Sequence, residues 1–151
     1  MIAVDGALRR FIKDSSAGDK VAKQFSDGDF KENVAKFVDR MFTSQTPASL
    51  KDSVRATMQS AEPHVAVSAM RNMFDPKIWT DDKIAVPLQV IVAKGPFAND
   101  ETKAFVLTLN PDADWRVMSD VGHFLMLENP RGFNEHLLGF LRKQGVVRSG
   151  E

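Results

Sequence analysis

The sequence has no cysteine among its 151 residues. This absence excludes disulfide bonds, thiolate catalysis and cysteine-ligated zinc. Basic and acidic residues balance at 20 each, and the basic ones form no cluster, so the charge pattern does not indicate a nucleic-acid partner. A glycine-rich phosphate loop is missing too, which leaves nucleotide binding without support.

Long apolar runs are also missing. No stretch approaches the roughly 18–20 apolar residues that cross a bilayer, so we expect no membrane partner. Met1–Val4 is followed at once by Asp5 and Gly6, which is not the pattern of a secretory signal peptide. The lack of a signal peptide and the lack of cysteine are compatible with a cytoplasmic location, which we therefore expect.

Histidine is scarce, and its spacing predicts no metal site. His64 and His136 fall in predicted helices and have no second ligand three or four residues further along. Zinc sites on helices use such pairs. We therefore expect neither a metal ion nor another cofactor.

What is present is the composition of one globular domain, with 43% apolar and 26% charged residues. Residues 1–4, 88–93 and 115–118 are predicted strands, and the middle one is apolar enough to be covered on both faces. From residue 88 to residue 143 the predicted order is strand, helix, strand, helix, which implies right-handed crossovers between parallel strands. The predicted fold class is therefore α/β.

Residues 7–83 are predicted to be mainly helical, opening weakly at 7–12 and interrupted at 15–18. Asp29, with Glu32 three residues later, forms a capping-box pattern at the start of one helix. Proline pairs predict two further helix starts and one helix end: Thr46-Pro47, Glu62-Pro63 and Asp75-Pro76. Apolar residues repeat at helical spacing along these segments, which indicates amphipathic helices.

The segment 114–130 carries the most informative pattern. Its predicted strand is broken at 119–122, where Gly122 is expected to free the backbone for a tight turn. His123 follows at the exit of the strand, and Asn129-Pro130 then begins a predicted helix with Asn as N-cap. Ligands and catalytic groups of open α/β sheets gather at the carboxyl ends of the strands. A single histidine in a loop is nevertheless more often structural than catalytic, so spacing alone leaves both interpretations open.

The stretch from Val121 to Pro130, followed by Phe133-Asn134, resembles the C-terminal signature of α/β-hydrolases. In that family the histidine of a nucleophile–acid–histidine triad is followed by an apolar pair, an acidic residue, a proline and the last helix. Residues 86–92 are similar to a late central strand of the family, and residues 2–5 resemble the strand before the cap.

The resemblance implies a partial α/β-hydrolase fold, with about three parallel strands, flanking helices and a helical cap insertion. Residues 1–151 would form one partial domain, in which 7–83 are the cap and 84–151 the C-terminal strand–helix core. As the cap would wall a substrate pocket, we expect a small substrate with an apolar part. The pocket residues implied by the resemblance are Phe37, Met41, Phe42, Met70, Phe74 and Phe124; phenylalanine and methionine at helical spacing are otherwise typical of a core.

The resemblance also implies that His123 is a general base. The family carries its nucleophile in a Gly-x-Ser-x-Gly turn, and no serine of this sequence has both glycines. We therefore expect a nucleophile from outside this chain. Glu128 is expected to pack or cap near the last helix rather than to react.

Two aspartates are candidates for the acid that orients His123. The family commonly places this residue in the loop that is Gly95–Ala98 here, where Ala98 occupies its position. Asp100 lies two residues later and fits equally well as a helix cap. Asp5 directly follows the first predicted strand, where some branches carry the acid, and we favour it over Asp100. The alternative for Asp5 is a plain turn residue at the end of a strand.

Three functions remain open. The first is the acid–histidine half of a hydrolase that cleaves an ester, amide, C–C or C–halogen bond. The second is a non-catalytic binding or interaction protein with an apolar pocket; the exposed edge of a truncated sheet invites pairing with a companion chain or with a second copy. The third is a gene fragment with no independent role.

Overall fold

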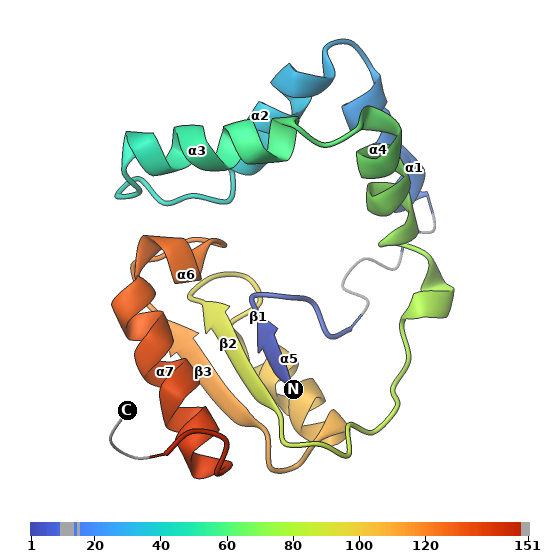
Figure 1. Ribbon diagram of the computed structural model, residues 1–151. Helices are drawn as coiled ribbons and strands as arrows, with labels where there is room; N and C mark the ends of the chain where they lie inside the picture. The colour runs from blue at the N-terminus through green and yellow to red at the C-terminus, as the bar shows by residue number, and fades with distance from the viewer. Residues whose placement is uncertain (10–13, 15, 149–151) are drawn as a thin grey trace. The chain divides into compact units, whose positions relative to one another are not determined.

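The structure, a computed structural model, describes residues 1–9, 14 and 16–148. These residues form two compact units (Figure 1). The sheet unit comprises Met1–Ala7, Thr43–Gln45 and Asp81–Glu151. The helical unit comprises Leu8–Phe42 and Thr46–Thr80.

A three-stranded parallel sheet forms the centre of the sheet unit. It contains β1 (Ile2–Val4), β2 (Gln89–Ala93) and β3 (Asp114–Met118), in the order β1-β2-β3. The predicted α/β class, the three strands and their parallel pairing are thus confirmed. Every residue of β2 is buried, because this apolar strand has a neighbour on each side. The carboxyl ends of the three strands lie along one edge of the sheet.

Helices cover both faces of the sheet. Figure 1 shows α5 (Asp100–Leu109) behind the strands and α7 (Pro130–Lys143) in front of them. The Asn129 side chain caps α7 as predicted, accepting from the N–H of Gly132 at 2.9 Å. The cap of α5 is Asn99, so the prediction of Asp100 as a cap is wrong by one residue; the asparagine has the extended backbone that an N-cap needs.

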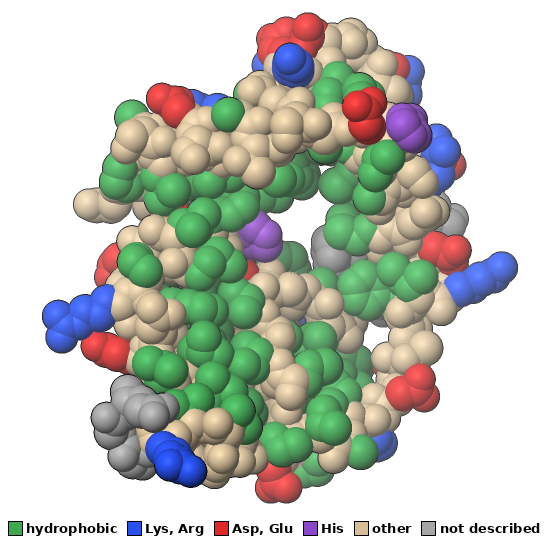
Figure 2. All heavy atoms as spheres, in the orientation of Figure 1, with side chains coloured by type: hydrophobic (Ala, Val, Ile, Leu, Met, Phe, Trp, Pro, Cys, Tyr) green, Lys and Arg blue, Asp and Glu red, His purple; other side chains and the backbone are tan. Residues whose placement is uncertain are grey.

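A short helix that the sequence pattern did not predict, α6 (Leu125–Glu128), lies between the His123 loop and α7. It is too short to show a helical repeat of apolar residues. Leu125 at its start is fully buried. Figure 2 shows hydrophobic side chains along α6 and α7 on the viewed face, and α7 buries only Phe140 completely.

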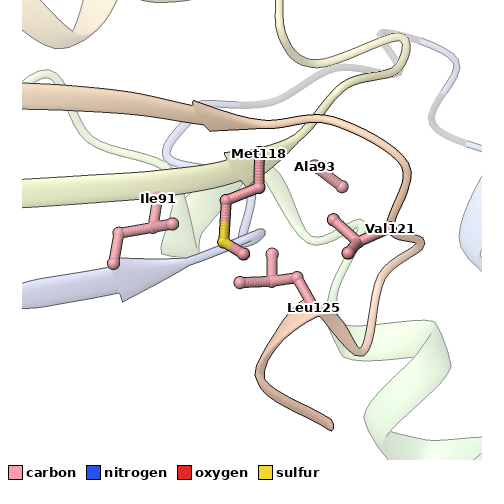
Figure 3. Packing of buried hydrophobic residues seen from close by; sticks show 5 residues of the cluster. All are labelled: Ile91, Ala93, Met118, Val121 and Leu125. Carbon is pink, nitrogen blue, oxygen red and sulfur yellow. The ribbon is translucent and has the colours of Figure 1, made fainter. Parts of the chain in front are cut away.

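A hydrophobic cluster lies beneath the carboxyl edge of the sheet (Figure 3). Figure 3 shows the Met118 side chain extending between Ile91 and Leu125. Val4 of β1 and Phe133 of α7 pack against the same cluster, whose buried members are Ile91, Ala93, Met118, Val121 and Leu125. Burial of one large aliphatic side chain contributes about 1.5–3 kcal/mol, so this cluster ties the loop after β3 firmly to the sheet.

The helical unit contains α1 (Ala17–Ser26), α2 (Phe30–Asp39), α3 (Ala48–Gln59), α4 (Pro63–Asn72) and the short 3-10 helix η1 (Pro76–Ile78). The predicted cap of α2 is confirmed, since the Asp29 side chain accepts from the N–H of Glu32 at 2.8 Å. α4 begins at Pro63, as the Glu62-Pro63 pair predicts, and it ends at Asn72, before the Asp75-Pro76 pair that was expected to mark its end. The short helix η1, which the sequence pattern did not predict, begins at Pro76.

Some helix boundaries differ from the prediction. α1 begins at Ala17, so the interruption expected at 15–18 is wrong for its second half. α2 ends at Asp39, and Met41 and Phe42 lie beyond it. Residues 7–9 are not helical, and the rest of the weak helix predicted at 7–12 lies outside the described residues.

Close packing explains why α1 includes a glycine despite the poor helix propensity of that residue. A Cβ atom on Gly18 would lie 2.8 Å from the carbonyl oxygen of Arg71 and 3.2 Å from the Cβ of Phe74. Only glycine therefore lets α1 approach the end of α4 so closely. Near the C-terminal end of α1, the rings of Phe25 and Phe37 meet edge to face with centroids 5.0 Å apart.

Candidate active site

Asp5 is the first residue after β1, and β2 holds both its backbone and its side chain. Its φ of 42° lies in the left-handed region, which aspartate tolerates better than most residues. Its N–H donates to the carbonyl oxygen of Ile91 at 2.8 Å, and its Oδ1 accepts from the N–H of Ala93 at 2.8 Å. The Asp5 carboxylate is thereby fixed at the carboxyl edge of the sheet, with Oδ2 available to a second donor.

That second donor is His123. Its Nδ1 lies 2.8 Å from Oδ2 of Asp5, although 118 residues separate the two in sequence. An ionised carboxylate can only accept, so with the ring neutral Nδ1 carries the proton and Nε2 keeps its lone pair. The side chain of Asp5 is 10% exposed and that of His123 is 43% exposed. A largely buried carboxylate thus hydrogen bonds to an imidazole that is partly exposed to solvent.

The loop that carries His123 is anchored on both sides. Val121 and Leu125, two residues before and two residues after the histidine, are both buried in the cluster below the sheet edge. Between them, the His123 ring meets the Phe124 ring edge to face at 5.3 Å. The left-handed turn residue in this loop is Asp120, with φ of 62°, whereas the sequence pattern placed the tight turn at Gly122.

Glu128 has a role that the sequence pattern did not predict. Asn129 caps α7, while Oε1 of Glu128 accepts from the N–H of Gly122 at 3.0 Å. The bond spans six residues around a turn and a short helix. Spacing rules for helices cover only contacts over three or four residues, so no sequence signal indicates it.

The structure separates the remaining candidate residues between the two units. Asp100 is exposed in the first turn of α5, and His123 hydrogen bonds to Asp5 instead. Phe124 is half-buried beside His123. The other predicted pocket residues belong to the helical unit, where Phe74 is buried and the rest are half-buried: Phe37, Met41, Phe42 and Met70.

The described residues contain no group of three or more histidine, aspartate or glutamate side chains placed to hold a metal ion. Within the same part of the chain, no helix has the length and apolar character needed to cross a membrane. What Asp5 and His123 can supply is acid–base chemistry, since an oriented neutral imidazole can take up a proton and later return it.

Sequence comparisons assign no family. No protein-family model matches the chain, and no curated protein matches it.

Solved structures do match. A thermophilic esterase from Thermogutta terrifontis aligns with a TM-score of 0.78 and 20% identity, over 94% of this chain and 55% of its own. An esterase from Exiguobacterium antarcticum aligns with a TM-score of 0.77 and 16% identity, over 93% and 56% of the two chains. The enol-lactonase from Burkholderia xenovorans LB400 gives a TM-score of 0.69 and 17% identity, over 93% and 55%.

These matches cover nearly the whole of this chain, which includes its three parallel strands and their flanking helices. The chain spans little more than half the length of the structures that it matches. At such low identity the likeness shows the fold and leaves the activity open. The chain therefore has part of the α/β-hydrolase fold.

Proposed function

We propose that these 151 residues are the acid–histidine half of a hydrolase, with His123 as general base and Asp5 as its orienting acid. The observation that carries this proposal is the 2.8 Å hydrogen bond between Nδ1 of His123 and Oδ2 of Asp5. If Asp5 were only a turn residue at the end of β1, it would not need a hydrogen bond to a histidine 118 residues away. The pair also lies at the sheet edge where α/β proteins bind their ligands.

In the proposed reaction, Nε2 of His123 takes a proton from a nucleophilic hydroxyl as that oxygen attacks the substrate carbonyl carbon. The imidazolium then gives this proton to the leaving group. In the second half of the reaction Nε2 takes a proton from water as the water oxygen attacks the acyl carbon, and the imidazolium returns this proton to the nucleophile's oxygen as the bond to the acyl group breaks. Asp5 stays ionised throughout, holding the ring in the Nδ1–H form and stabilising its positive charge.

The nucleophile is proposed to come from polypeptide that these 151 residues do not include, either a further segment or a companion chain. No serine here lies in a Gly-x-Ser-x-Gly turn, and the matching structures extend well beyond the aligned part. β1 is an edge strand whose residues are only half-buried, in contrast to those of β2. Its outer edge is the place where a further parallel strand can pair.

An ester or a related acyl compound with an apolar part is the substrate class that we favour. The matching structures include two enzymes described as esterases and one described as an enol-lactonase. Amide, C–C and C–halogen bonds remain alternatives within the same fold. The pocket residues and the cap role expected for the helical unit remain part of this proposal, as does the cytoplasmic location.

The test uses the chain joined to, or co-expressed with, a polypeptide that supplies a Gly-x-Ser-x-Gly turn. Hydrolysis of p-nitrophenyl acetate should be lost on His123→Ala and kept on His64→Ala, which changes an exposed histidine of α4. The 151-residue chain alone should show no hydrolysis that depends on His123. Undiminished turnover by the His123→Ala enzyme would contradict the proposal.

A non-catalytic interaction protein is the second candidate, favoured by the outer edge of β1. In that case the chain pairs with a second copy or a partner, and His123 only stabilises the loop. Sedimentation of the purified chain separates the two possibilities. A stable dimer that forms no active enzyme with the nucleophile-bearing polypeptide favours this second function.

A further inference from the structure

Glu128 lies at the end of α6, but its carboxylate reaches back to the loop before the helix. Its Oε1 accepts from the N–H of Gly122 at 3.0 Å, in partly buried surroundings. Gly122 is the residue immediately before His123. The bond therefore closes residues 122–128 into a hydrogen-bonded loop that contains the histidine.

Backbone hydrogen bonds support the C-terminal part of this loop, after His123. The N–H groups of Leu127 and Glu128 both donate to the carbonyl oxygen of Phe124, at 2.7 and 3.0 Å. Buried Leu125 anchors the same turn to the core. In the N-terminal part of the loop, the Gly122 N–H donates to the Glu128 carboxylate. The carboxylate thus fixes the backbone orientation immediately before His123.

We propose that Glu128 is a positioning residue that aims the His123 ring at Asp5. This inference rests on the proposed function, in which His123 is the base. A carboxylate bound to a backbone N–H forms a charge-assisted hydrogen bond, stronger than a bond between neutral groups. Catalytic groups must be held to within about 0.5 Å, and an exposed side chain on a loop needs such support. Glu128 acts through the backbone and does not touch the reacting atoms.

This inference is tested by the tautomer of His123, measured by nitrogen-15 NMR of the intact chain with the ring neutral. A neutral histidine without a partner favours the Nε2–H form, whereas the bond to Asp5 requires the Nδ1–H form. Glu128→Leu should shift the ring toward the Nε2–H form and should deprotect the Gly122 amide from hydrogen exchange. Glu128→Gln should preserve both signals, because its carbonyl oxygen can accept the same N–H.

Two further variants separate positioning from general damage to the fold. Glu128→Asp keeps the charge but is one methylene too short, so it should behave like Glu128→Leu. Glu135→Leu removes an exposed acid of α7 that pairs with Arg131, and it should leave the tautomer unchanged. A Nδ1–H tautomer and a protected Gly122 amide retained in both Glu128→Leu and Glu128→Asp would overturn the inference. An unchanged tautomer in Asp5→Asn would instead count against the proposed function, so the two failures are distinguishable.

Discussion

The two units differ in how exposed their polar contacts are: the Asp5 side chain in the sheet unit is 10% exposed, whereas the carboxylates of the ion pairs within the helical unit are 45% exposed or more. In the sheet unit, Asp5 bonds to Ala93 and to His123 over separations of 88 and 118 residues. In the helical unit, Lys23 pairs with Asp27 and Lys36 with Glu32, each one helical turn apart. Both carboxylates of these helical pairs are more than half exposed, so such pairs contribute little to stability.

This difference indicates which unit carries the candidate active site. Burying most of a carboxylate costs desolvation free energy, and such groups cluster at functional sites, whereas exposed ion pairs on helices mainly give local support. The acid–histidine pair lies entirely within the sheet unit, while the predicted pocket residues other than Phe124 lie in the helical unit. The helical unit is therefore expected to tolerate substitution without losing the Asp5–His123 bond.

The largest effect is expected for Asp5→Asn. The asparagine oxygen can still accept from the Ala93 N–H, and asparagine tolerates the left-handed φ, so the fold should survive. Its amide would donate to His123 and select the wrong tautomer, lowering kcat of the completed enzyme by about 10⁴-fold. The matched control is Asp100→Asn, on an exposed residue of α5, whose kcat should stay close to wild type. Equal losses in the two variants would contradict the choice of acid.

The next effect is expected in the core below the sheet edge. Leu125→Ala empties a fully buried site and should lower the free energy of unfolding by about 2–5 kcal/mol. Its control, Leu127→Ala, truncates a side chain that is 48% exposed and should change stability by less than about 0.5 kcal/mol. Urea denaturation measures both. Similar losses at the two positions would show that the loop is not anchored through Leu125.

A pair of glycines compares the two units directly. Gly18→Ala should destabilise the helical unit by about 1–3 kcal/mol, because the new Cβ meets the Arg71 carbonyl oxygen at 2.8 Å. Gly139→Ala in α7 meets nothing within 4 Å and should stabilise its helix by up to about 1 kcal/mol. Neither change should alter the His123 tautomer. A stabilising Gly18→Ala, seen by thermal unfolding, would contradict the close approach of α1 and α4.

The smallest effect is expected for Asp14 at the start of the helical unit. Its pKa lies below the ordinary value because its side chain bonds to Lys20 and accepts from Ser16. A lowered pKa in the folded state adds stability above about pH 4, and this stability is lost as the pH falls through the lowered pKa. The Asp14 side chain is half exposed, so the gain is small. Asp14→Asn should lower the thermal midpoint slightly at pH 7 and by a smaller amount at pH 2; an equal shift at both would exclude a charge effect.

Much of the local structure could be predicted from the sequence. Strands β1, β2 and β3 and the caps at Asp29 and Asn129 agree with patterns that depend only on neighbouring residues. The errors arose where tertiary contacts outweigh local preference. Gly18 lies inside a helix because another helix packs against it, and α6 is too short to carry a periodic signal.

For the candidate site, the residue types alone establish which chemical groups are available: no thiol, no serine in a nucleophile turn, and one histidine following a predicted strand. Which carboxylate meets that histidine, and that Glu128 bonds to its loop, became visible in the folded chain. This is because side-chain identity and helical spacing are local properties of the chain. A hydrogen bond across 118 residues exists only after parallel strands have brought their carboxyl ends to one edge.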